Sequence, residues 1–183
     1  NKKILLITGA SSGSENINKT ICSLLDKLGK FADSWQIVHL AGRANFEKVK
    51  SSYAAAAKIS HKVLDYCDNM PDLLAAADLA IGRSGAVSVA EYAAAGLPSI
   101  CMPYPYHKDM HQYLNAGKLV EAGAAMIVDD VPDETDRAEW LWEELEELMG
   151  DDLARLEMKK ACTTIARKDA ALKIAEKLLG LVK

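Results

Sequence analysis

Short apolar runs alternate with amphipathic segments along most of the chain. Six of these runs have the length of buried strands: Lys3–Thr8, Trp35–Leu40, Lys62–Cys67, Asp78–Ile81, Ser99–Met102 and Ala124–Val128. Helices are expected between them, over Glu15–Leu28, Phe46–Ala57, Met70–Ala76, the stretch that carries Ser88 and Glu91, and Asp109–Ala122. This alternation predicts a parallel sheet with helices on both faces. We therefore expect a doubly wound, Rossmann-like α/β domain with a six-stranded sheet.

The pattern changes after Val128. Residues 129–152 are dominated by Asp and Glu, with Arg137 as the one basic residue, yet a helical spacing persists at Leu141, Leu145 and Leu148. This combination predicts an amphipathic helix with a solvated acidic face. A further helix near the C-terminus is indicated by Ala171, Ile174, Ala175, Leu178 and Val182. We expect it to pack on the sheet or, in a longer protein, on a neighbouring domain.

Length and charge narrow the classes of function. The 183 residues suit one domain, spanning residues 1–183, and the hydrophobic fraction of 50% fits an ordinary globular core. A formal net charge of −4 offers no basic footprint for nucleic acid. No apolar run approaches the roughly 20 residues of a membrane span, and no signal peptide opens the chain. Because the first predicted strand follows Asn1 almost at once, we expect a domain cut from a longer protein.

The four cysteines are isolated from one another. Cys22, Cys67, Cys101 and Cys162 form no C-x-x-C pair, so the sequence gives no support to a zinc ribbon or a redox motif. Their apolar neighbours predict buried or half-buried thiols in a reducing cytosol.

The stretch Arg83–Pro98, RSGAVSVAEYAAAGLP, is the first candidate for chemistry. It joins two predicted strands through a small-residue turn and a helix, whose first N–H groups would face the edge of the sheet. Ser88 and Glu91 lie three residues apart, on one face of that helix. Two interpretations stay open: a capping box, which spacing alone favours, or a site in which Glu91 accepts hydrogen bonds from a ribose diol. For Arg83 the alternatives are an anionic ligand or a nearby acid.

The loop after the first strand, Gly9–Ser14, lacks the G-x-G-x-x-G fingerprint of dinucleotide-binding proteins. Gly9 and Gly13 nevertheless bracket serines directly before a helix, and the backbone N–H groups and hydroxyls there suit a diphosphate. The alternative is an ordinary strand-to-helix turn with Ser14 as the N-cap. The loop alone does not decide between them.

The segment Tyr104–Ala116, YPYHKDMHQYLNA, follows the fifth predicted strand and so lies at the same edge of the sheet. His107 and His111 are four residues apart, but the pattern is not H-E-x-x-H and no third ligand is evident, so we expect no metal site. His111, Gln112 and Asn115 suit a polyhydroxyl ligand, with an ordinary surface helix as the alternative. Since no spacing indicates a catalytic triad or a catalytic base, we expect no catalytic residue in this chain.

These segments together resemble a known family. The run RSGAVSVAEYAAAGLPSICMPYPYHKDMHQYLNA, from Arg83 to Ala116, resembles the donor-binding half of the MurG family, the peptidoglycan N-acetylglucosaminyltransferases of bacteria. The resemblance covers the whole chain, from the glycine-serine loop to the E-A-G-A-A strand. It implies the C-terminal Rossmann-like domain of a two-domain GT-B enzyme.

The resemblance also implies roles by position. Ser11, in the same loop as Gly13, would contact the diphosphate of UDP-N-acetylglucosamine, and the backbone at Cys67 would meet the uracil. Ser88 would lie near the phosphates and Glu91 on the ribose hydroxyls. The stretch expected to bind the nucleotide comprises Arg83, Ser84, Gly85, Ala86, Val87, Ser88, Val89, Ala90 and Glu91.

At the sugar, the resemblance implies that Gln112, with His111 and Asn115, binds the N-acetylglucosamine hydroxyls. The first loop departs from the family's G-G-S-Q-G-A, because Ala10 stands in place of glycine and Ser12 in place of glutamine. Glycine permits the closest approach of backbone to ligand, so Ala10 argues against the tightest contact. Ser12 removes any contact that the longer side chain would make.

For the full-length protein, the resemblance implies inverting transfer of N-acetylglucosamine to lipid I, the lipid-linked muramoyl-pentapeptide, to give lipid II for the cell wall. It implies no cofactor and no metal, and a cytoplasmic protein peripheral on the inner membrane. The acceptor site and the membrane contact would belong to an N-terminal domain absent from this chain. We therefore expect the chain to bind donor without turning it over, since transfer needs acceptor and base together.

Other interpretations stay open. A related UDP-sugar hydrolase or lipid glycosyltransferase would share the donor site. A non-catalytic nucleotide-binding module would use Ser88 and Glu91 only as a helix cap. A NAD-dependent dehydrogenase is disfavoured because the fingerprint after the first strand is missing.

Overall fold

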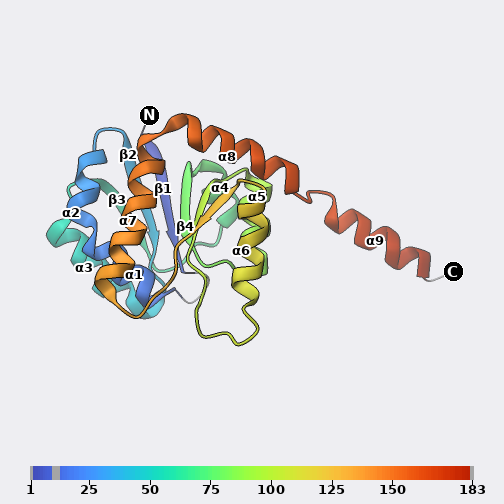
Figure 1. The fold of residues 1–183 in the computed structure, drawn as a ribbon, viewed down its shortest axis with the longest axis horizontal. Coiled ribbons are helices and arrows are strands. Elements are labelled where there is room, and N and C mark those ends of the chain that lie inside the picture. The colour runs from blue at the N-terminus through green and yellow to red at the C-terminus, as the bar shows by residue number, and fades with distance from the viewer. Residues whose placement is uncertain (1, 10–12, 182–183) are drawn as a thin grey trace.

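A parallel sheet forms the centre of the protein. The computed structural model describes residues 2–9 and 13–181, and six strands pair in it in the order β3-β2-β1-β4-β5-β6. The strands are β1 (Lys3–Thr8), β2 (Trp35–Leu40), β3 (Ser60–Leu64), β4 (Leu79–Gly82), β5 (Ser99–Cys101) and β6 (Ala125–Ile127). Every pairing is parallel. The predicted doubly wound α/β domain is confirmed (Figure 1).

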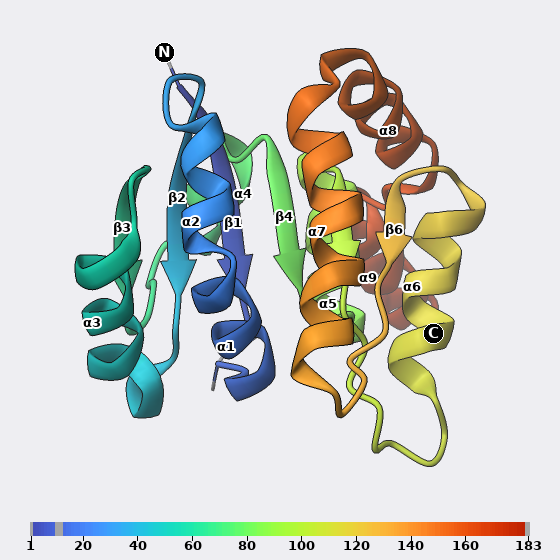
Figure 2. The ribbon, with the colours of Figure 1, turned by 60° about the vertical axis from the view of Figure 1, so that its left-hand side comes forward.

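Helices cover both faces of the sheet. They are α1 (Glu15–Ser23), α2 (Leu25–Leu28), α3 (Phe46–Ala56), α4 (Met70–Ala76), α5 (Ala86–Ala95), α6 (His111–Glu121), α7 (Glu134–Gly150), α8 (Asp152–Ile165) and α9 (Ala170–Leu181). Figure 2 shows α1, α2 and α7 in front of the sheet, with α4 and α5 behind it. The buried side chains divide in the same way, since one cluster includes α1, α2, α3 and α7 and the other includes α4, α5 and α6.

The alternation of side chains along β1 builds both halves of the core. Leu5 and Ile7 belong to the cluster under α1 and α7, whereas Leu6 between them belongs to the cluster under α5 and α6. All three side chains are fully buried. A strand covered on both faces needs apolar residues at consecutive positions, which is why β1 appears in the sequence as an unbroken apolar run.

The largest differences from the predicted element boundaries are at the third strand and the first helix. The third strand is Ser60–Leu64 rather than Lys62–Cys67, because its pairing with β2 ends at Leu40 opposite Leu64. Cys67 therefore lies in the loop that follows. The predicted helix Glu15–Leu28 is interrupted at Leu24, whose N–H bonds to the carbonyl of Ile21, so two helices form.

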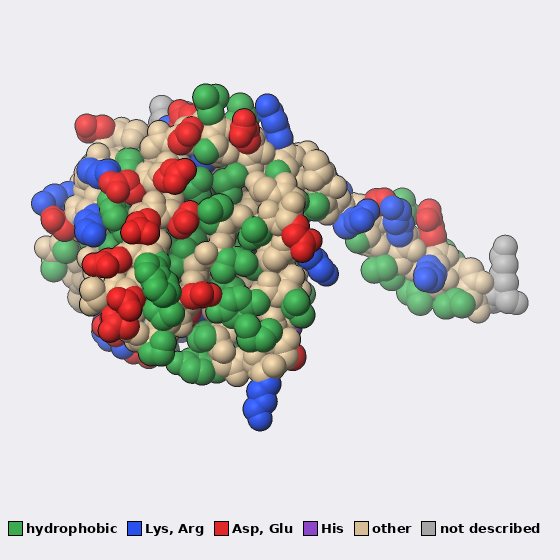
Figure 3. Space-filling model, viewed as in Figure 1, with side chains coloured by type: hydrophobic (Ala, Val, Ile, Leu, Met, Phe, Trp, Pro, Cys, Tyr) green, Lys and Arg blue, Asp and Glu red, His purple; other side chains and the backbone are tan. Residues whose placement is uncertain are grey.

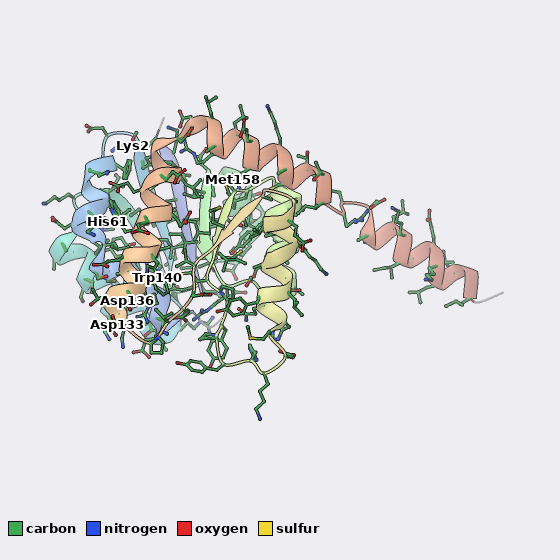
Figure 4. The ribbon with its side chains drawn as sticks, viewed as in Figure 1. Lys2, His61, Asp133, Asp136, Trp140 and Met158 are labelled. Carbon is green, nitrogen blue, oxygen red and sulfur yellow. The ribbon has the colours of Figure 1, made fainter. Side chains whose placement is uncertain are left out.

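The acidic stretch is only partly a solvated face. Helix α7 forms as predicted, and Asp136 and Trp140 lie on its exposed side (Figure 4). Asp130 and Arg137, however, are 2% and 1% exposed. Arg137 donates through Nε to Thr20 Oγ1 at 2.8 Å and through Nη1 to a backbone carbonyl. The prediction of a solvated face is therefore wrong for this pair, because each buried charge has a partner.

The C-terminal part of the chain forms two helices. Helix α8 was not predicted from the sequence, and α9 lies in a different place from one of those expected. Helix α8 begins at the N-cap Asp151 and buries Met158 and Cys162 against the sheet domain. Every residue of α9 is exposed, and Figure 1 shows this helix extending away from the rest of the protein. Packing of α9 on the sheet, one of two expected arrangements, is therefore wrong. Packing on a neighbouring domain stays a prediction.

Figure 3 shows apolar side chains along one side of α9 and charged ones along the other. The exposed apolar residues are Leu172, Ile174, Leu178, Leu179 and Leu181. Over residues 2–9 and 13–181, no helix is both long enough and apolar enough to cross a membrane.

Tyr92 carries an unusual hydroxyl group. Its ring is 1% exposed and packs against the end of β4, where a methyl group added to Gly82 would lie 2.4 Å from Tyr92 Oη. Within the described residues, Tyr92 Oη is a buried side-chain oxygen without a hydrogen-bond partner. Burial raises the pKa of this phenol well above its ordinary value, so the hydroxyl stays protonated.

Removing α9 should leave the stability of the domain unchanged. Deletion of residues 168–183 takes away α9, whose side chains are already exposed to water, so the free energy of unfolding should change by less than about 0.5 kcal/mol. Urea denaturation measures this change, with the buried Leu145→Ala as a control that should lose about 2–5 kcal/mol. A truncation as costly as the control would mean that α9 packs on the domain.

Replacing Tyr92 by Phe should stabilise the protein by about 1 kcal/mol, because it removes a buried hydroxyl that forms no hydrogen bond. Tyr53→Phe is the matched control, since Tyr53 Oη lies 3.0 Å from His39 Nδ1 and its loss should destabilise the protein by about 1 kcal/mol. Thermal unfolding of both variants gives the two changes. If Tyr92→Phe destabilises the protein as Tyr53→Phe does, then Tyr92 Oη forms a stabilising hydrogen bond and the expectation is wrong.

Candidate functional site

Two hollows open at the carboxyl ends of the strands, the edge at which open parallel sheets bind ligands. The first hollow has a volume of about 290 Å³ and is lined by Thr8, Leu40, Gly42, Asp65, Tyr66, Cys67, Met70, Val87, Ser88, Glu91 and Tyr92. The second hollow has a volume of about 770 Å³ and is lined by Gly9, Gly13, Ser14, Glu15, Asn16, Arg83, Gly85, Tyr104, Tyr106, His107 and Gln112. The start of α5 separates them, since Gly85 lines the second hollow and Val87 lines the first.

The predicted capping box at Ser88 and Glu91 does not form. Helix α5 begins at Ala86 with Gly85 as its N-cap, so Ser88 is the third helical residue and Glu91 the sixth. A capping box would need Ser88 at the N-cap position. The interpretation that spacing alone favoured is therefore wrong, and both side chains line the first hollow instead.

Only some residues of the predicted nucleotide-binding stretch line the first hollow, and their position on helix α5 decides which. Val87, Ser88 and Glu91 line the first hollow. Val89 packs against the core under α5, and Ala86 and Ala90 are exposed. Residues three and four apart share a helix face, so Val87, Ser88 and Glu91 lie on the one side of α5 that lines the hollow.

The loop after β3 completes the first hollow. It carries Cys67, which is half-buried, together with Tyr66 and Asp65. The parallel order β3-β2-β1-β4 brings this loop to the same edge as the start of α5. The structure therefore places Cys67 in one cavity with Ser88 and Glu91, as expected for residues of one site.

The first loop combines a helix cap with a tight turn. Ser14 Oγ accepts a hydrogen bond from the N–H of Ile17 at 3.4 Å, so the N-cap interpretation is confirmed. Gly13 has a φ of +76°, and a Cβ atom there would lie 2.3 Å from the carbonyl oxygen of Ala41, so this position requires glycine. Gly13 also lines the second hollow. Ser11 lies outside the described residues, and its contact with a diphosphate stays a prediction.

A buried hydrogen-bond network of Asn18, His39 and Tyr53 holds the backbone that packs against this turn. Asn18 Nδ2 donates to the carbonyl of Ala41 at 2.9 Å, and His39 Nε2 lies 2.9 Å from Asn18 Oδ1. Burial lowers the pKa of His39 to about 3, so the imidazole is neutral at ordinary pH. Since Asn18 Oδ1 only accepts, His39 Nε2 donates to it and Nδ1 accepts from the hydroxyl of Tyr53.

Arg83, directly after β4, donates four hydrogen bonds within the protein. Its guanidinium donates to the carbonyls of Met102 at 2.8 Å and Pro103 at 3.2 Å, and to Ser14 Oγ at 2.8 Å. It also pairs with Asp130 Oδ2 at 2.7 Å, and both side chains of the pair are buried. Of the two alternatives for Arg83, pairing with an acid is confirmed. Contact with a ligand anion stays a prediction.

Hydrogen bonds join the turn before α5 to the start of α6. Ser84 is fully buried, and its Oγ donates to the carbonyl of Gln112 at 2.9 Å. Asn115 Nδ2 donates to the carbonyl of Ser84 at 3.2 Å. Gln112 Oε1 accepts from the N–H of Tyr104 at 2.9 Å, and Gln112 lines the second hollow. Ser84 and Asn115 therefore position the two helices that border the site.

The loop between β5 and α6 carries a cluster of aromatic and imidazole rings. The centroids of Tyr104 and His107 are 4.9 Å apart, and those of His107 and His111 are 4.4 Å apart. His111 Nδ1 lies 2.7 Å from Asp109 Oδ1, and this hydrogen bond lowers the pKa of the Asp109 carboxyl. Met110 between them has a φ of +52°, and α6 begins directly after it, two residues later than predicted.

Sequence reasoning missed Asp130. It accepts from Asn16 Nδ2 at 2.8 Å as well as from Arg83, so it joins α1 to β4 beneath the second hollow. The acidic run made Asp130 look solvated. Its position two residues after the predicted sixth strand was the available signal, since side chains there reach the edge of the sheet.

This arrangement suits an anion next to a diol. The first turn of α5 presents unpaired backbone N–H groups and the positive end of the helix dipole, and Gly85 has no side chain to cover them. Two carboxylates line the first hollow: that of Asp65, on the loop after β3, and that of Glu91, which comes from α5 itself. Such a site can bind phosphate oxygens at the helix start and hydroxyl groups at a carboxylate.

Comparison with known proteins shows the same domain in longer enzymes. The chain is 40% identical over 179 residues to the UDP-N-acetylglucosamine–N-acetylmuramyl-(pentapeptide) pyrophosphoryl-undecaprenol N-acetylglucosamine transferase of Haemophilus ducreyi, and 35% identical over 180 residues to the enzyme of that name from Cronobacter sakazakii. Each alignment covers 98% of this chain but 48% of the relative, so the chain spans about half the length of these relatives.

The crystal structure of MurG from Acinetobacter baumannii superimposes with a TM-score of 0.87 at 28% sequence identity. The superposition covers 98% of this chain and 52% of that one. Residues 4–176 match the C-terminal domain of glycosyltransferase family 28. The chain therefore belongs to glycosyltransferase family 28, of which it forms a C-terminal domain.

Proposed function

We propose that this chain is the domain that binds UDP-N-acetylglucosamine in a MurG-type N-acetylglucosaminyltransferase. The observation that carries the proposal is the pair of hollows on either side of the exposed start of α5, with Glu91 in one and Gln112 in the other. The name of the Haemophilus ducreyi relative specifies the same donor sugar. The full-length protein would transfer that sugar to the lipid-linked muramoyl-pentapeptide.

The two hollows suggest where each part of the donor would bind. The smaller would take the nucleoside, with the uracil near the backbone of Cys67 and the ribose hydroxyls on Glu91. The diphosphate would cross the start of α5 near Ser88 and approach Gly13 and Ser11. The larger hollow would take the N-acetylglucosamine beside Gln112.

Two of the predicted sugar-binding residues act differently in this proposal. The Asn115 amide group is bonded to the backbone of Ser84, and the His111 ring to Asp109. We infer that Asn115 positions the turn before α5. His111 would reach a sugar hydroxyl after leaving Asp109.

This domain would supply half of an active site. The acceptor, the catalytic base and the membrane contact would come from the remainder of a protein about twice this length. We propose that the chain by itself binds the donor and transfers nothing, because catalysis needs acceptor and base held against the donor. The cytoplasmic face of the inner membrane is the proposed location of the full-length protein.

The geometry of α5 does not favour the interpretation as a non-catalytic module. It required Ser88 and Glu91 to act only as a helix cap, whereas Gly85 is the N-cap and both side chains line a hollow. A UDP-sugar hydrolase or another lipid glycosyltransferase would use the same nucleotide site. The choice of sugar separates these alternatives from the leading proposal.

Replacing Glu91 by Ala should weaken UDP binding at least about tenfold, or about 1.4 kcal/mol, because the ribose hydroxyls lose their acceptor. The free energy of unfolding should change by less than about 0.5 kcal/mol, since Glu91 does not cap α5. Isothermal titration calorimetry with UDP and urea denaturation measure the two effects. Glu121→Ala, an exposed glutamate of α6, is the matched control and should bind UDP normally. Unchanged affinity in Glu91→Ala would remove Glu91 from the site.

The chain should bind UDP-N-acetylglucosamine more tightly than UDP-glucose or UDP-galactose, because the larger hollow would contact the N-acetyl group and the sugar hydroxyls. Competition titrations against UDP measure the order, and chromatography of the incubated donor measures turnover. A preference for UDP-glucose or UDP-galactose would contradict the proposed sugar, while release of free sugar would indicate a hydrolase.

A further inference from the structure

The loop between β5 and α6 brings three metal-binding side chains together outside the contacts proposed for the nucleotide. Ligand atoms of His107, Asp109 and His111 all lie within 4.8 Å of one another. From the sequence we expected no metal site at His107 and His111, because no third ligand was evident. In the structure, Asp109 offers a third donor: the backbone turns at Met110, and Asp109 Oδ1 lies 2.7 Å from His111 Nδ1.

The donor set selects a class of ion. Two imidazole nitrogens and one carboxylate oxygen are a ligand set of zinc and other divalent transition metals, and catalytic zinc sites use three protein ligands of this kind. Magnesium and calcium favour sites made of oxygen ligands, which this cluster does not supply. Half-buried Cys22 and Cys67 lie on other elements and are not part of the cluster.

The three side chains are free to close around an ion. A tetrahedral zinc with bonds near 2.1 Å holds its ligand atoms about 3.4 Å apart, so no separation between the three ligand atoms has to shrink by more than about 1.4 Å. His107 and Asp109 are exposed and His111 is half-exposed, and the aromatic neighbours of His107 are the rings of Tyr104 and His111 in the same loop and helix start, so the side chains can rotate without disturbing the buried core. The hydrogen bond of His111 to Asp109 already holds two ligands in contact.

The cluster borders the larger hollow. His107 and Tyr104 both line that hollow, and their two rings pack edge-on against each other. An ion held by three protein ligands keeps a coordination position for water or another small ligand. That position would lie at the rim of the hollow.

We propose that His107, Asp109 and His111 bind one divalent transition metal ion of the zinc class. The metal site shares His111 with the proposed sugar contact, but the inference does not rest on donor binding, because zinc binding is measured without nucleotide.

Titration of zinc into the tag-free chain tests the site. Cys22→Ser and Cys67→Ser are introduced first, since these half-buried cysteines could also bind zinc as thiolates. We expect one ion per chain, and an affinity at least about tenfold lower in each of His107→Ala, His111→Ala and Asp109→Asn. His61→Ala is the matched control, because His61 is an exposed histidine on β3, at the opposite edge of the sheet, and should leave the affinity unchanged (Figure 4).

Cobalt substitution gives a second measurement. Bound cobalt should show the intense visible absorption of a four-coordinate nitrogen–oxygen site, and this absorption should disappear in the double variant His107→Ala, His111→Ala. Thermal unfolding of the metal-free variants checks that the exposed substitutions leave the fold intact. Equal zinc affinity in the variants and the parent, or no binding at millimolar zinc, would overturn the proposal.

Discussion

The ion pair of Arg83 and Asp130 is the contact on which the ligand-facing edge depends. Arg83 directly follows β4 and Asp130 follows β6. The other hydrogen bonds of Arg83 reach Ser14 at the start of α1 and the carbonyls after β5. One guanidinium thus connects four separate loops. Removing one member of a buried pair typically costs about 3–5 kcal/mol, because the other charge stays buried without a partner. Here that loss would also separate the loops that form the larger hollow.

The two hollows are mechanically connected above this pair. Ser84 follows Arg83 directly, and its hydroxyl and carbonyl are bonded to the first and second turns of α6. The turn that carries the N–H groups of α5 is therefore fixed to the helix that carries Gln112. A ligand spanning both hollows would meet a preorganised surface, which lowers the entropic cost of binding.

The sequence was a good guide to the sheet and a poorer one to its edges. β1 and β4 are buried on both faces, so their apolar runs predicted them almost to the residue. β3 is an edge strand that starts with the exposed residues Ser60, His61 and Lys62, and its limits come from pairing with β2, which no local pattern encodes. Helix α8 was missed because the charges of the preceding acidic run obscured the spacing of its buried residues.

The candidate site shows the same limit. The three loops were found because parallel strands bring their carboxyl ends to one edge. The capping box was predicted from a spacing that fits two structures, and only the position of the helix start, at Ala86, distinguishes them. The burial of Asp130 depends on Arg83, 47 residues away, and the meeting of Asp109 with His111 depends on the backbone at Met110. These are tertiary or conformational facts that a residue pattern does not contain.

The unequal lengths of the strands have a consequence for hydrogen exchange. β1 and β2 have six residues each, whereas β5 and β6 have three each, at one end of the sheet. Few ladder hydrogen bonds have to break for that end to open, so we expect its amide protons to exchange through local openings while those of β1 exchange only on global unfolding. The loop of His107 and the start of α6 are attached to this less protected end. Local opening there would move the side of the larger hollow that carries Tyr104, His107 and Gln112, while its other side stays on the loops after β1 and β4.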